Sequence, residues 1–339
     1  MQLSEAEMQV LASIRAAECE GSATDRASID ARGEAYWIYK EDWSIAYEAL
    51  IGKGLAKFDN TGYRLTSSGR PLGDQYRDEK PDMYWYYYQM FYSTARASAT
   101  YSRLCEQVFG KDLCQDGQMD MASFDDLLQL LDLHEGDRVL DLGCGAGAIA
   151  EYISDETGAH VTGVDFAESG IAEATARTAE KKDRLQFTRD NFNTLALESD
   201  SYDAVVSIDS LYWASDLEAM VGRLAESLKP GGRMGIFMNH HIGPSESADH
   251  LEAEHSVLYK VLQNLDLSFE VHDYTESIRQ FWLRLYRVVT GLQSDFEAEG
   301  NGDIATRLIH ECESDYLADV ENERIARYLF HVRIPSLLD

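Results

Sequence analysis

The sequence has no long apolar run and no cysteine pair of the kind that binds metal. None of its hydrophobic stretches approaches the ~18 residues that a transmembrane helix needs. Its start, MQLSEAEMQV, lacks the basic and apolar regions of a secretion signal. The five cysteines are scattered and form no CxxC pair, which predicts neither a disulfide framework nor a zinc site. We therefore expect a soluble, cytoplasmic protein with no membrane partner and no metal.

Positive charge is scarce as well. The chain has 339 residues, with 30 Lys and Arg against 60 Asp and Glu, and its net charge is −30. Such a field repels phosphate backbones, so no nucleic-acid partner is expected. An acidic surface also suits a salty setting, which favours a marine source. The length allows one large domain or two smaller ones.

Residues 1–75 are expected to form a separate unit of three helices and a hairpin, a winged-helix pattern. Ser4 is a candidate helix N-cap, with Glu7 three residues later. The third predicted helix carries Glu41, Asp42 and Glu48, whereas a DNA-reading helix should be basic. Dimerisation or lid formation is therefore favoured over DNA binding, and we expect a homodimer.

Residues 76–128 are predicted to form a helical connector that contains the aromatic run MYWYYYQMFY, Met83 to Tyr92. Aromatic faces attract cations, each contact contributing about 0.5–2 kcal/mol. The connector is therefore a candidate lid, and Tyr84, Tyr88 and Tyr92 are candidate substrate-binding residues. Ordinary packing between domains is the competing interpretation of these rings.

Residues 129–339 alternate short apolar runs with helical segments, a pattern typical of an α/β fold with a parallel sheet. A helical insertion is expected at about 276–322. The predicted strands cover residues 138–143, 160–166, 184–191, 202–209, 232–240, 269–275 and 327–334. The last of these is expected to be antiparallel, and the segment LKPGG is expected to be the turn that leads into the fifth.

The segment VLDLGCGAGAIAEYI carries the most specific signal, because its three glycines lie between a strand and a helix. Asp141 lies near the end of that strand, where a dinucleotide fingerprint keeps an apolar residue. Asp165 ends the second strand, where a carboxylate can accept hydrogen bonds from two ribose hydroxyls. Asp141 and the later LKPGG therefore disfavour a NAD-type Rossmann site.

Together these motifs resemble the class I S-adenosylmethionine-dependent methyltransferases, over about residues 101–239. The resemblance implies a Rossmann-like seven-stranded sheet and S-adenosylmethionine as cofactor. It places Asp141 and the glycines at the methionine part of the donor, Asp165 at the ribose, and Asp190 and Asn191 at the adenine. The donor-binding residues that it implies are Asp141, Gly143, Gly145, Gly147, Asp165, Phe166, Asp190, Asn191, Phe192, Asp209, Ser210 and Gln115.

The methyl acceptor is expected to be a small molecule. A phenol, hydroxyl or ammonium must lose a proton to a base, whereas a thioether has none to lose. The candidate bases are His240 and His241 at the end of the fifth strand, and His272 with Asp273 in the sixth; a structural role is favoured for His272. Tyr212 and Trp213 are candidates to line the reacting centre, and Arg279 and Arg284 are candidates to hold an acceptor carboxylate.

In overall layout the chain is similar to the bacterial S-methyltransferases that methylate 4-methylthio-2-hydroxybutyrate in dimethylsulfoniopropionate synthesis. This resemblance implies a thioether acceptor and a sulfonium product. Two alternatives stay open. One is an O- or N-methyltransferase of an aromatic metabolite. The other is a winged-helix regulator that senses the donor. The acidic third helix disfavours this alternative.

Overall fold

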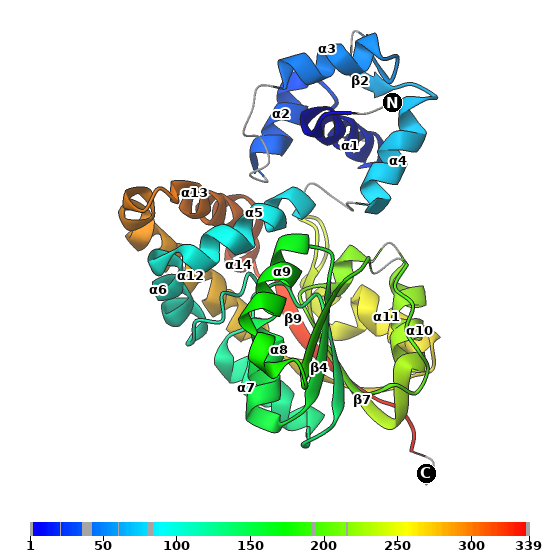
Figure 1. Cartoon of the computed structure of the whole chain (residues 1–339), viewed down its shortest axis with the longest axis vertical. Helices are drawn as coiled ribbons and strands as arrows, with labels where there is room; N and C mark the ends of the chain where they lie inside the picture. Colours follow the sequence, from blue (N-terminus) through cyan, green and yellow to red (C-terminus); the bar gives the residue numbers. More distant parts are fainter. Residues whose placement is uncertain are drawn as a thin grey trace. The chain divides into compact units, whose positions relative to one another are not determined.

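The computed structural model describes residues 3–20, 22–35, 43–59, 61–79, 84–191, 194–214 and 216–336. The chain divides into two compact units, Met1–Phe91 and Tyr92–Asp339, which run from blue to cyan and from cyan to red in Figure 1. The boundary falls inside one helix, α5 (Tyr84–Ala97). No helix in the described ranges is both long and apolar enough to cross a membrane.

The first unit contains the predicted three helices and hairpin. A capping box opens its first helix, because Ser4 N donates to Glu7 Oε2 (2.7 Å) and Glu7 N donates to Ser4 Oγ (3.2 Å). Trp43 and Tyr47 are among its buried core residues. The elements are α1 (Glu5–Glu20), α2 (Arg26–Ala35), α3 (Ser44–Gly52), the antiparallel pair β1 (Ala56–Asp59) and β2 (Gly62–Leu65), and α4 (Gly69–Glu79). Assignment of this unit to the winged-helix class stays a prediction.

The second unit is built on a seven-stranded sheet in the order β5-β4-β3-β6-β7-β9-β8. Neighbouring strands from β5 to β7 are parallel, and β9 is antiparallel to both of its neighbours. The strands are β3 (Arg138–Leu142), β4 (His160–Asp165), β5 (Leu185–Arg189), β6 (Tyr202–Ile208), β7 (Leu228–His241), β8 (Ser268–Asp273) and β9 (Ile325–Arg333). The predicted Rossmann-like sheet and its antiparallel last strand are confirmed.

One predicted strand boundary in this sheet was wrong. The segment LKPGG was expected to be a turn before the fifth strand, but β7 already begins at Leu228. Leu228 pairs with Tyr202 of β6, and a shift of register separates this pair from the regular pairing that starts at Arg233. A bulge lets the turn-like residues remain within the strand.

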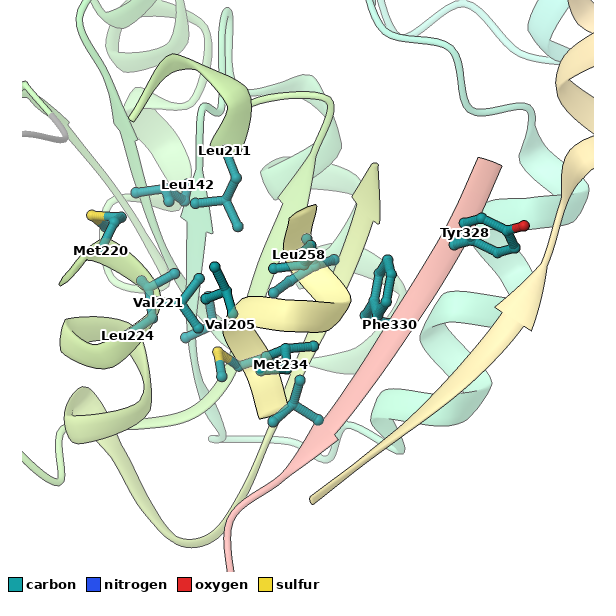
Figure 2. Packing of buried hydrophobic residues seen from close by; sticks show 14 of the residues in the cluster. Leu142, Val205, Leu211, Met220, Val221, Leu224, Met234, Leu258, Tyr328 and Phe330 are labelled. Carbon is teal, nitrogen blue, oxygen red and sulfur yellow. The ribbon is translucent and has the colours of Figure 1, made fainter. Parts of the chain in front are cut away.

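Helices cover both faces of the sheet (Figure 1). α7 (Met121–Leu131), α8 (Ala148–Thr157) and α9 (Glu168–Arg177) lie on one face, and α10 (Leu217–Ser227) and α11 (Val257–Asn264) lie on the other. Figure 2 shows the core of the second face, which includes Met220, Val221, Leu224, Val205, Met234, Leu258 and Phe330. Burial on both faces explains why the parallel strands read as continuous apolar runs.

The predicted helical insertion lies between β8 and β9. It comprises α12 (Thr275–Ala298), α13 (Gly302–Glu311), a π-helical turn (Cys312–Tyr316) and α14 (Leu317–Glu321). α12 packs along α6 (Ala99–Phe109). Glu299, at the end of α12, accepts hydrogen bonds from Ser98 Oγ (2.6 Å) and Thr100 N (2.9 Å). A carboxylate is favoured at a helix N-terminus, so this contact fixes the insertion to the start of α6.

Candidate active site

The glycine loop joins β3 to α8 at the carboxyl edge of the parallel strands, where open α/β sheets bind their ligands. Gly143 N and Cys144 N donate to the Val164 carbonyl (2.8 and 3.1 Å), which fixes the loop to β4. Gly147 has a φ of +69°, and a Cβ there would overlap the Phe187 ring. The loop is therefore tightly packed at Gly147, where only a residue without a Cβ fits.

Asp165 ends β4 and is 7% exposed. Its Oδ2 accepts from Gly145 N (2.8 Å), and its Oδ1 accepts from Ala167 N (2.8 Å). Burial raises the pKa of Asp165, and these backbone hydrogen bonds oppose the shift. The carboxylate is thus held against the glycine loop, at the place expected for a ribose partner.

Asp141 lies on β3, two residues before the loop, and is 3% exposed. Its Oδ2 is buried and has no hydrogen-bond partner among the described residues. Burial, followed by the charge of Asp165, raises the pKa of Asp141 to about 7. An unpaired buried oxygen is costly, and a cationic group of a bound ligand would provide the missing partner.

Tyr92 reaches the glycine loop from α5. A Cβ on Gly145 would overlap the Tyr92 hydroxyl, and a Cβ on Gly170 would lie 3.0 Å from its ring. Burial, followed by the charges of Asp165 and Asp116, raises the pKa of Tyr92 well above its ordinary value, so the phenol stays neutral. This predicted substrate residue therefore lies against the predicted donor loop.

The predicted adenine residues follow β5. Asp190 N donates to the Asp165 carbonyl (3.0 Å), and Asn191 N donates to Asp190 Oδ1 (2.7 Å). The Phe166 carbonyl accepts from the Arg189 guanidinium (3.2 Å). Phe192 lies outside the described residues. The assignment of Asp190 and Asn191 to the adenine accordingly stays a prediction. The backbone of both residues follows β5, at the edge of the sheet where it was expected.

A buried ion pair lies where β6, β7 and β9 meet. Asp209 follows β6 with a φ of +53°, in the left-handed region. Arg327 of β9 donates to both of its carboxylate oxygens (2.6 and 2.9 Å), and the two side chains are 2% and 4% exposed. Arg327 also donates to Asn239 Oδ1 (2.8 Å). Removing one partner of such a pair costs about 3–5 kcal/mol, because it leaves a buried charge uncompensated.

The segment QDGQMD, Gln115 to Asp120, contacts this ion pair. Gln118 N donates to Asp209 Oδ2 (2.8 Å), and Asn239 Nδ2 donates to Gln118 Oε1 (2.5 Å). Asp120 caps α7 and accepts from Arg284 of α12 (3.2 Å). The segment is therefore held between the sheet edge and the helical insertion.

Two predicted donor residues use their side chains inside the protein. Gln115 Oε1 accepts from Leu113 N (2.9 Å), within its own loop. Ser210 Oγ donates to the Leu142 carbonyl (2.6 Å) and lies 2.7 Å from Ser207 Oγ. Both residues shape the site through the backbone that they hold.

Aromatic rings gather beyond Asp209. Tyr212 and Trp213 lie in a short 3-10 helix, with ring centroids 5.2 Å apart. Tyr212 is 47% exposed as a whole residue. Desolvation of its hydroxyl, followed by the charge of Asp209, raises the pKa of Tyr212 well above its ordinary value. The charges of Tyr316, Glu311 and Asp116 raise the pKa of this hydroxyl further.

The insertion contributes a stacked pair to this group. Tyr316 of the π-helical turn lies on Trp282 of α12, with ring centroids 3.6 Å apart and an interplanar angle of 11°. π-helical turns occur frequently at functional sites. Tyr212, Trp213, Tyr316 and Trp282, with the carboxylates of Asp116 and Glu311, are called the acceptor group below.

The candidate bases are engaged in polar contacts. His240 Nε2 lies 2.7 Å from the His250 carbonyl, and burial lowers the pKa of His240. His241 Nδ1 lies 2.9 Å from Asp319 Oδ2, and its ring centroid is 5.7 Å from that of Tyr316. His241 therefore adjoins the acceptor group, whereas His240 contacts the chain that follows β7.

Of the remaining predicted substrate residues, the structure describes the side chains of Arg279 and Arg284. Arg279 pairs with Glu323 (3.9 Å), and Arg284 pairs with Asp120 (3.2 Å). The side chains of Tyr84 and Tyr88 lie outside the described part of the chain. Both arginines thus have carboxylate partners from the protein itself.

Sequence reasoning missed several residues of this site. Arg327 carried one signal, since it is a cation at the start of the mostly apolar strand RYLFHVRI. Nothing in the sequence indicated that Asp209, 118 residues earlier, is its partner. The residues that were missed are Asp116, Gln118, Asn239, Trp282, Glu311, Tyr316 and Arg327.

Comparison with known proteins adds to this geometry. Residues 139–232 match a family model described as a methyltransferase domain. The chain is 38% identical over 105 residues to a sterol 24-C-methyltransferase of Gibberella zeae, which covers 30% of this chain and 27% of that protein. It is 32% identical over 138 residues to phosphoethanolamine N-methyltransferase 2 of Caenorhabditis elegans, covering 39% and 30%. The chain spans about a third of the length of such curated relatives.

Among solved structures, the fold is similar to that of phosphoethanolamine N-methyltransferase 2 of Haemonchus contortus. The TM-score is 0.60 at 20% identity, over 74% of this chain and 60% of that one. That structure contains phosphomonomethylethanolamine and S-adenosylhomocysteine.

The sheet order is the one that the class I resemblance implies, and residues 139–232 match a methyltransferase domain. S-adenosylmethionine is the cofactor that the sequence motifs lead us to expect. The residues present fit this group, because Cβ atoms would crowd the glycine loop and Asp141 keeps an unpaired buried oxygen that an ammonium could contact.

Proposed function

We propose that the protein transfers a methyl group from S-adenosylmethionine to a small molecule, and that the acceptor is a thioether. The observation that carries the choice of acceptor is the acceptor group beside Asp209. Its rings and carboxylates favour a positively charged product, because aromatic faces and carboxylates both attract a sulfonium. When bound, S-adenosylmethionine supplies an electrophilic methyl group.

Methylation of a thioether would not depend on the histidines. A thioether has no proton to lose, so its methylation needs no base. His240 and His241 are bonded to a carbonyl and to a carboxylate of the protein. The phenols of Tyr92 and Tyr212 have raised pKa values and stay neutral. These groups can orient an acceptor and exclude water without taking up a proton.

The acceptor that we propose is 4-methylthio-2-hydroxybutyrate, with 4-dimethylsulfonio-2-hydroxybutyrate as the product, in dimethylsulfoniopropionate biosynthesis. Its carboxylate needs a donor, and Arg279, Arg284 and Arg327 already pair with carboxylates of the protein. Hydroxyl donors of the acceptor group, such as Tyr212 and Tyr316, would then bind the acid end.

A second candidate is N-methylation of an amine. The carboxylates of Asp116 and Glu311 near Tyr212 also suit an ammonium, and His241 with Asp319 could accept its proton. The similarity to phosphoethanolamine N-methyltransferases agrees with this candidate.

The test is methyl transfer to a panel of acceptors, read by mass spectrometry at marine ionic strength. The panel contains 4-methylthio-2-hydroxybutyrate, methionine, phosphoethanolamine and a catechol. We expect the hydroxy acid to be methylated at a rate that changes little between pH 7 and 9, because no acceptor proton is lost. Asp165→Ala should abolish donor binding in calorimetry and serves as the inactive control.

Other results separate the candidates. A rate that rises with pH and is largest for an amine would establish N-methylation and exclude the thioether. Methylation of no small acceptor by a protein that binds S-adenosylmethionine would contradict both candidates.

A further inference from the structure

A second cluster of chemically reactive side chains lies on β8 and β9. Glu270 of β8 is paired directly with His331 of β9, and His272 follows Glu270 on the same face of the strand. One ligand atom from each of Glu270, His272 and His331 lies within 4.8 Å of the other two. The sequence predicted no metal site, because this cluster forms only when the two strands pair.

The atoms that face one another in this cluster have unsatisfied hydrogen-bonding capacity. His331 is 2% exposed, and both of its ring nitrogens are buried without a hydrogen-bond partner among the described residues. His272 Nε2 is buried and unpartnered as well. It lies 3.9 Å from Glu270 Oε2, which is too long for a hydrogen bond. Unpaired buried polar atoms are rare in folded proteins and require an explanation.

We propose that Glu270, His272 and His331 bind a divalent transition-metal ion of the zinc type. Two imidazoles and a carboxylate are ligands that zinc prefers, with bonds of about 2.0–2.2 Å and a fourth position left for water. Tetrahedral ligands then lie about 3.4 Å apart, so side-chain movements of about 1 Å would close the site. An ion would give His272 Nε2 and one ring nitrogen of His331 a partner.

The surroundings allow this ligation. Glu270 Oε1 pairs with Arg333 (3.3 Å), while Oε2 faces His272, so the carboxylate can keep the arginine and still bind an ion. The half-exposed Glu270 side chain leaves an entry path from solvent.

Binding of the ion would stabilise the folded protein. β8 is the edge strand of the sheet, and the three ligands join it to β9. His331 is four residues from Arg327 along β9, which is about 13 Å at the rise of an antiparallel strand. The metal site is therefore separate from the candidate active site, and its test does not depend on the proposed function.

The test measures zinc binding by the full-length protein at pH 7.5, with a fluorescent zinc competitor and by the rise in Tm. We expect one zinc ion per chain and a Tm that increases with zinc, because an ion that binds the folded state stabilises it. His272→Ala should weaken binding by more than about tenfold, since even loss of an outer-shell partner costs 10–100-fold. Glu270→Gln should weaken zinc binding as well.

His160→Ala is the matched control. His160 begins β4 and is exposed, and three strands separate β4 from β9 in the sheet. Its loss should leave zinc affinity and the zinc-induced rise in Tm unchanged. Zinc affinity equal in His272→Ala and His160→Ala would overturn the proposal. Loss of zinc affinity in His241→Ala, with unchanged zinc affinity in His272→Ala, would overturn the proposal too. That result would assign the ion to the end of β7.

Discussion

At the scale of single residues, Asp141 should make donor binding depend on pH. Burial and the charge of Asp165 raise its pKa to about 7, so much of it is protonated at neutral pH. Folding favours that protonated form, and its contribution to stability falls as pH rises from about 4, the unfolded pKa, towards 7. The ammonium of the donor's methionine part, which we expect beside Asp141, would favour the ionised form instead.

We therefore predict that S-adenosylmethionine binds more tightly at pH 7.5 than at pH 5.5 and that binding releases a proton near pH 6.5. Calorimetry in two buffers of different ionisation enthalpy measures both quantities. Asp141→Asn should bind more weakly and lose this pH dependence. Equal affinity of the unmodified protein at the two pH values would contradict the assignment.

At the scale of elements, the turn from β3 into α8 depends on Gly147. Its φ is +69°, and a Cβ would meet the Phe187 ring and Ala174. Gly147→Ala should therefore lower the free energy of unfolding by more than about 1 kcal/mol, from backbone strain alone. Thermal unfolding followed by circular dichroism measures the change.

The matched control for this change is Gly291→Ala. Gly291 lies inside α12, and a Cβ there would meet no atom within 4 Å. Alanine should raise stability by about 0.5–1 kcal/mol at that position. A Gly147→Ala protein as stable as its parent would show that the loop can take another conformation.

The elements of the fold were largely predictable, because they depend on short-range pattern. Apolar runs indicated all seven strands of the large sheet, and the spacing of Ser4 and Glu7 indicated a capping box that is present. The glycine loop and Asp165 could be proposed as donor-binding residues because their expected chemistry follows from their positions beside strands. The beginning of β7 could not, since proline and two glycines indicate a turn where a bulge is formed.

The acceptor side of the site was much less predictable. Tyr212 and Trp213 could be proposed because they follow a strand end, whereas Trp282 and Tyr316 come from an insertion whose packing the sequence does not specify. Arg279 and Arg284 were expected to face a substrate, yet each lies beside a carboxylate of the protein. Which cation pairs with which anion depends on tertiary structure that no local pattern encodes.

At the scale of the whole molecule, residues 1–75 are predicted to build a dimer. The second unit, Tyr92–Asp339, contains the complete sheet and its own cores. Deletion of residues 1–75 should therefore leave a folded protein that binds S-adenosylmethionine, but as a monomer. Light scattering after size-exclusion chromatography gives the mass, and calorimetry with the donor verifies the fold. A truncated protein with the same number of subunits as its parent would exclude this role.

The position of β9 in the sheet also has a consequence for biosynthesis. β9 lies between β7 and β8, although it is made after both of them and after the whole helical insertion. It supplies Arg327, the partner of buried Asp209. A nascent chain can form the parallel strands and the glycine loop while translation continues. Until Arg333 has left the ribosome, however, β7 has an unpaired edge, β8 has no partner, and the charge of Asp209 is uncompensated.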